Sequence, residues 1–108
     1  VDLNERAASR GELQRFALLA HAIVPVLRST GFAPDVIHCH DWHTALGPLL
    51  LRAAGATPRS VLTLHNIGYQ GWFDPALVAD LGLAPHRGQL AAAPGAPGSP
   101  SFLATGIA

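Results

Sequence analysis

The sequence predicts an α/β fold, with a parallel βαβ unit and flanking helices. Two short apolar segments rich in β-branched residues, 35–39 and 60–65, are typical of parallel strands that are buried on both faces. The stretch between them, 44–54 (TALGPLLLRAA), has the length and apolar content of a helix. A strand, a helix and a strand within about thirty residues form a βαβ unit, and its crossover is expected to be right-handed.

A long amphipathic helix is expected before this unit. From Gly11 onward, apolar residues recur at steps of three and four and share one helix face: Leu13, Phe16, Leu19 or Ala20, Ile23 or Val24, and Leu27. Pro25 should kink or loosen the last turns, and Gly31 should end the helix. Residues 1–10 are polar and unpatterned, which predicts a loop.

The helix between the two strands has its own start and stop signals. Asp41 or Thr44 is available as its N-cap, Pro48 lies in its first turns, and Gly55 should end it. Two parallel strands alone do not make a stable sheet with both faces covered. We therefore expect residues 1–90 to be part of a larger α/β domain.

The C-terminal third is less regular. A loop is expected after Asn66, and Asp74 should open a short helix that ends near Leu81 and Gly82. The low-complexity segment 91–100 (AAAPGAPGSP) is expected to be flexible. Residues 101–108 turn apolar again and predict the start of another helix.

Composition excludes several classes of protein. Seven basic and seven acidic residues give no net charge, so a broad nucleic-acid-binding surface is not expected. There is no apolar run of about twenty residues to cross a membrane, and the polar N-terminus is unlike a signal peptide. The single Cys39 cannot form an internal disulfide. These features favour a soluble, intracellular protein with no membrane or nucleic-acid partner, and they predict no particular oligomeric state.

The candidate site lies where the two strands end. Ligands of open parallel sheets bind at the carboxyl ends of the strands. The first strand ends in HCHDWH, which contains Asp41, and the second ends in His65 and Asn66. Four of the six histidines and one carboxylate would then share one edge of the sheet. Such groups suit the hydroxyls of a sugar, and apolar ring faces could come from four aromatic residues: Trp42, Tyr69, Trp72 and Phe73.

Structural roles and a metal site are alternatives to a sugar site. His38 and Cys39 could be packed core residues, and Asp41 could be only a helix cap. His38, His40 and His43 also form H-x-H-x-x-H, as in a zinc hydrolase. This pattern resembles the H-x-H-x-D-H signature of the metallo-β-lactamase superfamily, but the aspartate lies one residue early. A metal-dependent hydrolase and a non-catalytic glucan-binding domain remain alternatives.

Two longer stretches are similar to the bacterial glycogen synthase and plant starch synthase family. PDVIHCHDWHTALGPLLLR resembles the hallmark P-D-[IV]-[IV]-H-x-H-D-W-H-[TA], and SVLTLHNIGYQGWFDP resembles T-[IV]-H-N-[LI]-[AG]-Y-Q-G. The flanking RFAL and FLATGI are similar to R-F-A-x-F and F-L-K-A-G-I, with Ala104 in place of the lysine.

The resemblance implies a partial N-terminal Rossmann-like domain of a two-domain GT-B glycosyltransferase. Such enzymes transfer glucose from ADP-glucose to the non-reducing end of an α-1,4-glucan with retention, and no metal or cofactor is implied. By resemblance, Asp41 and His65 are catalytic, and the substrate-binding residues are Asn66, His40, His43, Tyr69, Gln70 and Gly71. The bacterial cytoplasm is the expected compartment, ahead of a plastid. The family's K-x-G-G-L loop and second domain have no counterpart here, so the 108 residues alone are expected to be inactive.

Overall fold

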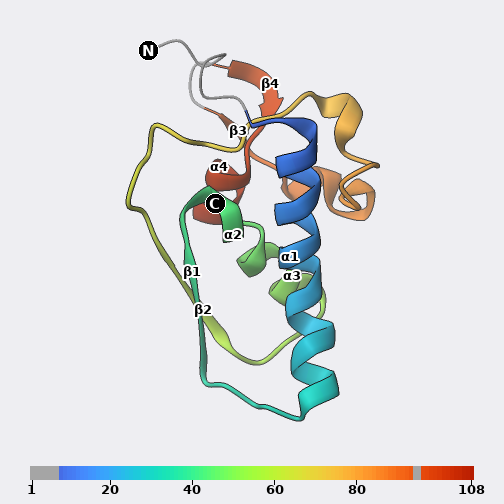
Figure 1. Ribbon diagram of the computed structural model, residues 1–108, viewed down its shortest axis with the longest axis vertical. Helices are drawn as coiled ribbons and strands as arrows, with labels where there is room; N and C mark the ends of the chain where they lie inside the picture. Colours follow the sequence, from blue (N-terminus) through green and yellow to red (C-terminus); the bar gives the residue numbers. More distant parts are fainter. Residues whose placement is uncertain (1–7, 94–95) are drawn as a thin grey trace.

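The computed structural model describes residues 8–93 and 96–108, so residues 1–7 of the loop predicted over 1–10 lie outside the described residues. Its elements follow in the order α1 (Arg10–Thr30), β1 (Val36–His40), α2 (Asp41–Thr44), α3 (Gly47–Ala53), β2 (Arg59–Thr63), the 3₁₀ turns η2 (Pro75–Leu77) and η3 (Ala84–Gln89), β3 (Ala92–Ala93), β4 (Ala96–Pro100) and α4 (Phe102–Ile107). In Figure 1, α1 and the β1–β2 pair run along the long axis on opposite sides, with α2 and α3 between them. No helix of the described residues is long and apolar enough to cross a membrane.

The predicted βαβ unit is confirmed. β1 and β2 pair in parallel, from Val36 opposite Arg59 to His40 opposite Thr63. The prediction that both faces of these strands are buried is wrong, because the helices pack against one face only. Cys39, on the helix side, is 2% exposed, whereas Val36 and Val61 on the outer face are 51% and 49% exposed. The outer face of the β1–β2 sheet is therefore open in the described part of the chain.

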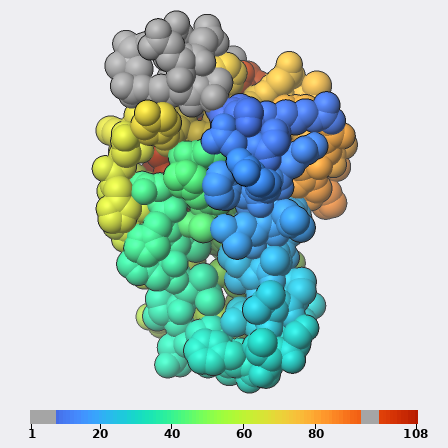
Figure 2. All heavy atoms as spheres, viewed as in Figure 1, coloured from blue at the N-terminus to red at the C-terminus, as the bar shows by residue number. Residues whose placement is uncertain are grey.

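A hollow of about 350 Å³ lies between α1 and β1 and opens on the face shown in Figure 2. Its walls are mostly apolar, with Leu19, Ile23 and Val26 on the helix side and Ile37 on the strand side. Of the candidate site residues, only His38 of the H-x-H-x-x-H pattern lines it, and none of the residues predicted to be catalytic or substrate-binding does.

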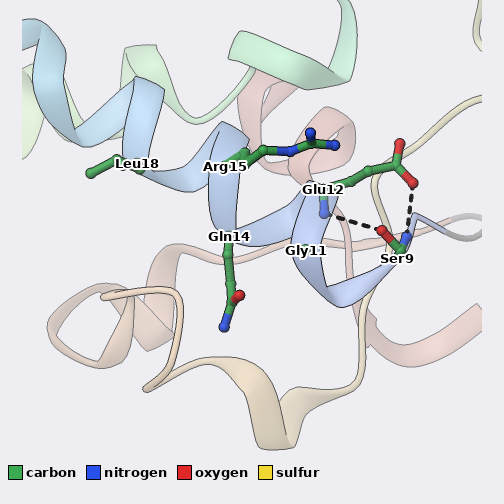
Figure 3. A pocket seen from close by; sticks show the side chains of 6 residues that line it. All are labelled: Ser9, Gly11, Glu12, Gln14, Arg15 and Leu18. Atoms are coloured by element: carbon green, nitrogen blue, oxygen red, sulfur yellow. Dashed lines mark hydrogen bonds between the residues drawn. The ribbon is translucent and has the colours of Figure 1, made fainter.

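The predicted first helix is confirmed as α1, with a capping box at its start. The Ser9 hydroxyl accepts a hydrogen bond from the Glu12 amide at 3.1 Å, and the Glu12 carboxylate accepts one from the Ser9 amide at 3.1 Å (Figure 3). These bonds lower the pKa of the Glu12 carboxyl. Ser9 and Glu12 line the shallow hollow drawn in Figure 3 together with Gln14 and Arg15, and this hollow holds no predicted site residue.

The rest of α1 differs from expectation in detail. The helix continues past Pro25 to Thr30, and Gly31 ends it with φ 68°, the left-handed conformation that glycine adopts without strain. Its buried residues are Leu13, Ala17 and Ala20. Leu19 is 48% exposed, so Ala20 is the member of that predicted pair that faces the core.

The single helix predicted over 44–54 is instead two short helices, α2 and α3. Asp41 is not the cap: it is the first residue of α2, and the N-cap position belongs to His40. The Thr44 hydroxyl bonds to the backbone at this end of the helix: it accepts a hydrogen bond from the His40 amide at 2.7 Å and donates one to the His40 carbonyl at 2.9 Å. Pro48 lies in the first turn of α3, and Gly55 follows that helix with φ 66°.

The hydrophobic core lies where α1, α2, α3 and α4 meet the segment from Phe73 to Leu83. Its largest fully buried apolar side chains are Phe102, Leu46, Leu83, Leu103 and Val78. Phe102 makes edge-to-face ring contacts with Trp42 at 5.6 Å and with Phe73 at 5.7 Å. Trp42 and Phe73 are only 5% and 3% exposed, so the expectation that they offer ring faces to a sugar is wrong.

The C-terminal segment contains a short β-ladder that the sequence did not predict. Within the stretch expected to be flexible, β3 and β4 pair in an antiparallel arrangement, and residues 94–95 lie outside the described residues. The helix predicted after residue 101 is confirmed as α4, where the Ser101 hydroxyl accepts a hydrogen bond from the Ala104 amide at 3.0 Å. Asp74 similarly caps η2, accepting from the Ala76 amide at 2.9 Å.

Candidate functional site

The Asp41 carboxylate joins the carboxyl ends of the two parallel strands. Its Oδ1 accepts one hydrogen bond from the His65 amide at 2.6 Å and another from the Asn66 amide at 3.3 Å. Asp41 and His65 are therefore neighbours, as the strand ends predicted. The contact is between the carboxylate and the backbone of His65, so Asp41 fixes where the chain leaves β2.

The backbone of Asp41 is unusual. Its φ of 55° makes it the one non-glycine residue with positive φ in the described part of the chain. An aspartate tolerates this conformation better than most residues do, and such outliers concentrate at functional sites. The sharp turn from β1 into α2 directs the carboxylate toward the end of β2. The hydrogen bond from the His65 amide, together with that from the Asn66 amide, lowers the pKa of the Asp41 carboxyl.

This lowered pKa gives a prediction for stability against pH. A carboxyl with a lower pKa in the folded state stabilises the fold above its unfolded pKa, ordinarily near 3.8. That contribution is lost as the pH falls through the folded-state pKa. We expect the free energy of unfolding of the wild type to fall more steeply below pH 4 than that of Asp41→Asn, measured by urea unfolding at a series of pH values. Parallel curves for the two proteins would contradict this role.

Three histidines form a row on the open outer face of the sheet. His38 Nε2 lies 2.7 Å from the Thr63 hydroxyl, and His40 Nδ1 lies 3.2 Å from His65 Nε2. The rings of His38 and His40 are 4.1 Å apart, and those of His40 and His65 are stacked at 5.5 Å. His38 is exposed, so the interpretation of it as a packed core residue is wrong: its strand face has no covering layer.

His43 points elsewhere. It lies on α2, where its ring stacks on Trp42 at 4.5 Å and meets the edge of Phe16 at 4.8 Å. The three histidines of the H-x-H-x-x-H pattern are thus divided between the sheet face and the helix. Among residues 8–93 and 96–108, no group of three or more His, Cys, Asp or Glu side chains is arranged to hold a metal ion.

The loop after β2 is held by its own polar side chains. The Asn66 side-chain oxygen accepts from the Gly68 amide at 2.9 Å, and the Gln70 side chain donates to the Ile67 carbonyl at 2.6 Å. The Tyr69 side chain is 48% exposed. Asn66 and Gln70 therefore shape the loop, and Tyr69 presents an aromatic face beside it.

Gly71, predicted to bind substrate, is buried in the core. Its φ is 63°, and a Cβ there would overlap the Trp42 ring and lie 3.0 Å from Phe102 Cβ. Its carbonyl accepts from the Phe102 amide at 3.1 Å. The residue thus permits the loop to pass tightly over Trp42 and to pair with the start of α4.

We expect Gly71→Ala to lower the free energy of unfolding by about 2 to 4 kcal/mol, the sum of a strained backbone and an overpacked core. Gly31→Ala is the matched control. It has nearly the same φ, 68°, but nothing lies within 4 Å of a Cβ there, so only the strain of about 1 kcal/mol should remain. Chemical unfolding of both variants tests this, and equal losses would contradict the packing role.

The prediction that Cys39 is a core residue is confirmed. It is 2% exposed, and burial raises the pKa of its thiol. Sequence reasoning missed Thr63, which holds His38 on the outer face. Its signal is positional, because Thr63 lies opposite His40 in the register and two residues before His65. This signal can be used only once the pairing of β1 with β2 is known.

The fold and the site together define an α/β protein whose polar residues gather at the carboxyl ends of parallel strands. The family model of the starch synthase catalytic domain matches residues 5–108. The chain belongs to this family, as the motif resemblance predicted.

Individual relatives and a solved structure point to the same family. The chain is 42% identical over 95 residues to a glycogen synthase of Ralstonia nicotianae, covering 86% of this chain and 17% of the relative. It is 42% identical over 76 residues to glycogen synthase 2 of Geobacter sulfurreducens, covering 65% of this chain and 16% of that protein. A solved structure of the catalytic domain of starch synthase IV from Arabidopsis thaliana, bound to ADP and acarbose, matches with a TM-score of 0.74 and 25% identity. That match covers 93% of this chain and 22% of the other, so the chain spans less than a quarter of each of these proteins.

Proposed function

We propose that this chain forms one wall of the active-site cleft of a retaining glucosyltransferase. The donor is ADP-glucose, and the acceptor is the non-reducing end of an α-1,4-glucan. In the reaction, the bond from the glucosyl C1 to ADP breaks, a bond from C1 to a glucan hydroxyl oxygen forms, and the hydroxyl proton is released. The bridge from Asp41 to the His65 and Asn66 amides carries the proposal, because it sets a histidine at the sheet edge where ligands bind.

The comparisons support the substrate class. The relatives are named glycogen synthases, and the Arabidopsis structure holds ADP, a nucleoside diphosphate, and acarbose. A sugar nucleotide and a glucan therefore fit this family. We place the protein in the bacterial cytoplasm rather than in a plastid, since the named relatives at 42% identity are bacterial.

The residues at the strand ends have different roles in this proposal. His65 contacts the transferred glucosyl unit and donates a hydrogen bond as charge develops. Asp41 acts through the backbone it holds. Asn66 and Gln70 shape the loop at the cleft mouth, where the exposed Tyr69 offers a ring face. His40 borders the cleft from the end of β1, beside His65. His43 follows on α2, where its ring lies against Trp42 and Phe16 and is further from this edge in its contacts.

The test is glucan extension by the synthase that carries this chain. With ADP-glucose and a maltooligosaccharide, we expect products longer by one glucose at a time and equimolar release of ADP. UDP-glucose serves as the comparison donor. Binding of the maltooligosaccharide without release of ADP would replace the transferase with a glucan-binding role.

A further inference from the structure

The contact between His40 and His65 joins a rigid residue to a less supported one. His40 is the last residue of β1, paired with Thr63 in the sheet and held at both its amide and its carbonyl by the Thr44 hydroxyl. His65 lies beyond the end of β2, where its backbone is tied by Asp41. Its exposed side chain has one protein hydrogen-bond partner in the described part of the chain, the ring of His40. The ring of His65 is thus oriented from the strand next to it.

The geometry of this contact restricts both imidazoles. His40 Nδ1 and His65 Nε2 are 3.2 Å apart. A neutral imidazole carries one N–H and one lone pair, so one nitrogen of the contact donates and the other accepts. The tautomer of one ring therefore fixes that of the other. Because Nε2 of His65 faces His40, Nδ1 is the nitrogen left to face a ligand.

We propose that His40 is a positioning residue for His65. Its ring holds the imidazole of His65 in one orientation and one tautomer, so that Nδ1 of His65 is presented to the bound sugar. An exposed histidine without this contact would sample several rotamers and would lose that freedom only when ligand binds. This inference rests on the proposed function in that the ligand is the glucosyl substrate.

Two substitutions of His40 separate the hydrogen bond from the ring. His40→Phe keeps an aromatic ring next to His38 and removes Nδ1. His40→Asn removes the ring but keeps a polar group near the position of Nδ1. In the synthase, we expect His40→Phe to lower kcat by about 10- to 100-fold through misplacement of His65, with little change in the KM for glucan. His40→Asn should recover most of that loss.

Thr63→Val is the matched control. It removes the partner of His38 on the same sheet face and leaves the contact between His40 and His65 intact. Its kcat should stay within about twofold of the wild type. Urea unfolding of the three variants checks that each is folded under the conditions of the assay.

A spectroscopic measurement tests the positioning without any turnover. In ¹⁵N-labelled protein at pH 8, the ring nitrogens of His65 should show one neutral tautomer in the wild type and in His40→Asn. They should show a mixture of the two tautomers in His40→Phe. Unchanged His65 nitrogen shifts in His40→Phe, or a kcat for His40→Asn no better than that of His40→Phe, would overturn the proposal. A wild type without glucosyl transfer would instead overturn the proposed function. The nitrogen shifts of His65 would still test whether His40 orients its ring.

Discussion

Replacing Phe102 with alanine is expected to lower the free energy of unfolding by about 3 to 5 kcal/mol. Phe102 is 0% exposed, and its ring makes edge contacts with Trp42 at 5.6 Å and with Phe73 at 5.7 Å. These partners come from α2 and from the loop before η2, so their backbones cannot close together over the space left behind. Urea unfolding followed by circular dichroism measures the loss.

Phe16→Ala is the control for this prediction. The sequence placed Phe16 on the apolar face of the first helix, where full burial would give a loss like that at Phe102. In the structure Phe16 is half-buried, packed edge-on against Trp42 at 5.2 Å and His43 at 4.8 Å. Its removal should cost about 1 to 2 kcal/mol. A loss at Phe16 equal to that at Phe102 would mean that the core does not centre on α4.

The elements of the fold were predictable because their signals are local. The three- and four-residue spacing of α1, the glycine after it, and the β-branched strands each follow from neighbouring residues. Burial was less predictable. Val36 and Val61 are as apolar as buried strand residues, yet they are half exposed, because burial depends on what covers the sheet. For Trp42 and Phe73 the prediction was wrong in the opposite direction: they were expected to face a ligand, and they are buried. An aromatic residue near a site has the same sequence signal as one in the core.

The site was predictable in place but not in its contacts. The rule that ligands bind at the carboxyl ends of parallel strands identified both Asp41 and His65. That rule does not say that Asp41 binds the backbone of the neighbouring strand end, because this depends on its positive φ and on the register of β1 with β2. The helix prediction over 44–54 failed at another point, since the chain divides there into α2, which ends at Thr44, and α3, which begins at Gly47.

His65→Ala is expected to give the largest loss of activity with little loss of stability. The backbone amide of His65, which binds Asp41, is kept in the variant, and the side chain itself is exposed. The fold should therefore tolerate the change. A hydrogen bond made in the transition state of a closed site typically contributes about 2 to 4 kcal/mol, which corresponds to a decrease in kcat of about 30- to 1,000-fold.

The kinetic pattern separates the role of the His65 side chain from a role of its backbone. A contact made only in the transition state lowers kcat and kcat/KM together, whereas one made equally in the ground state raises KM. His86→Ala, at a histidine in η3 outside the site, is the control and should leave kcat within about twofold of the wild type. An unchanged kcat in His65→Ala, together with a large loss of kcat in Asp41→Asn, would mean that activity depends on the backbone position that Asp41 holds. The imidazole would then have no part in the transfer step.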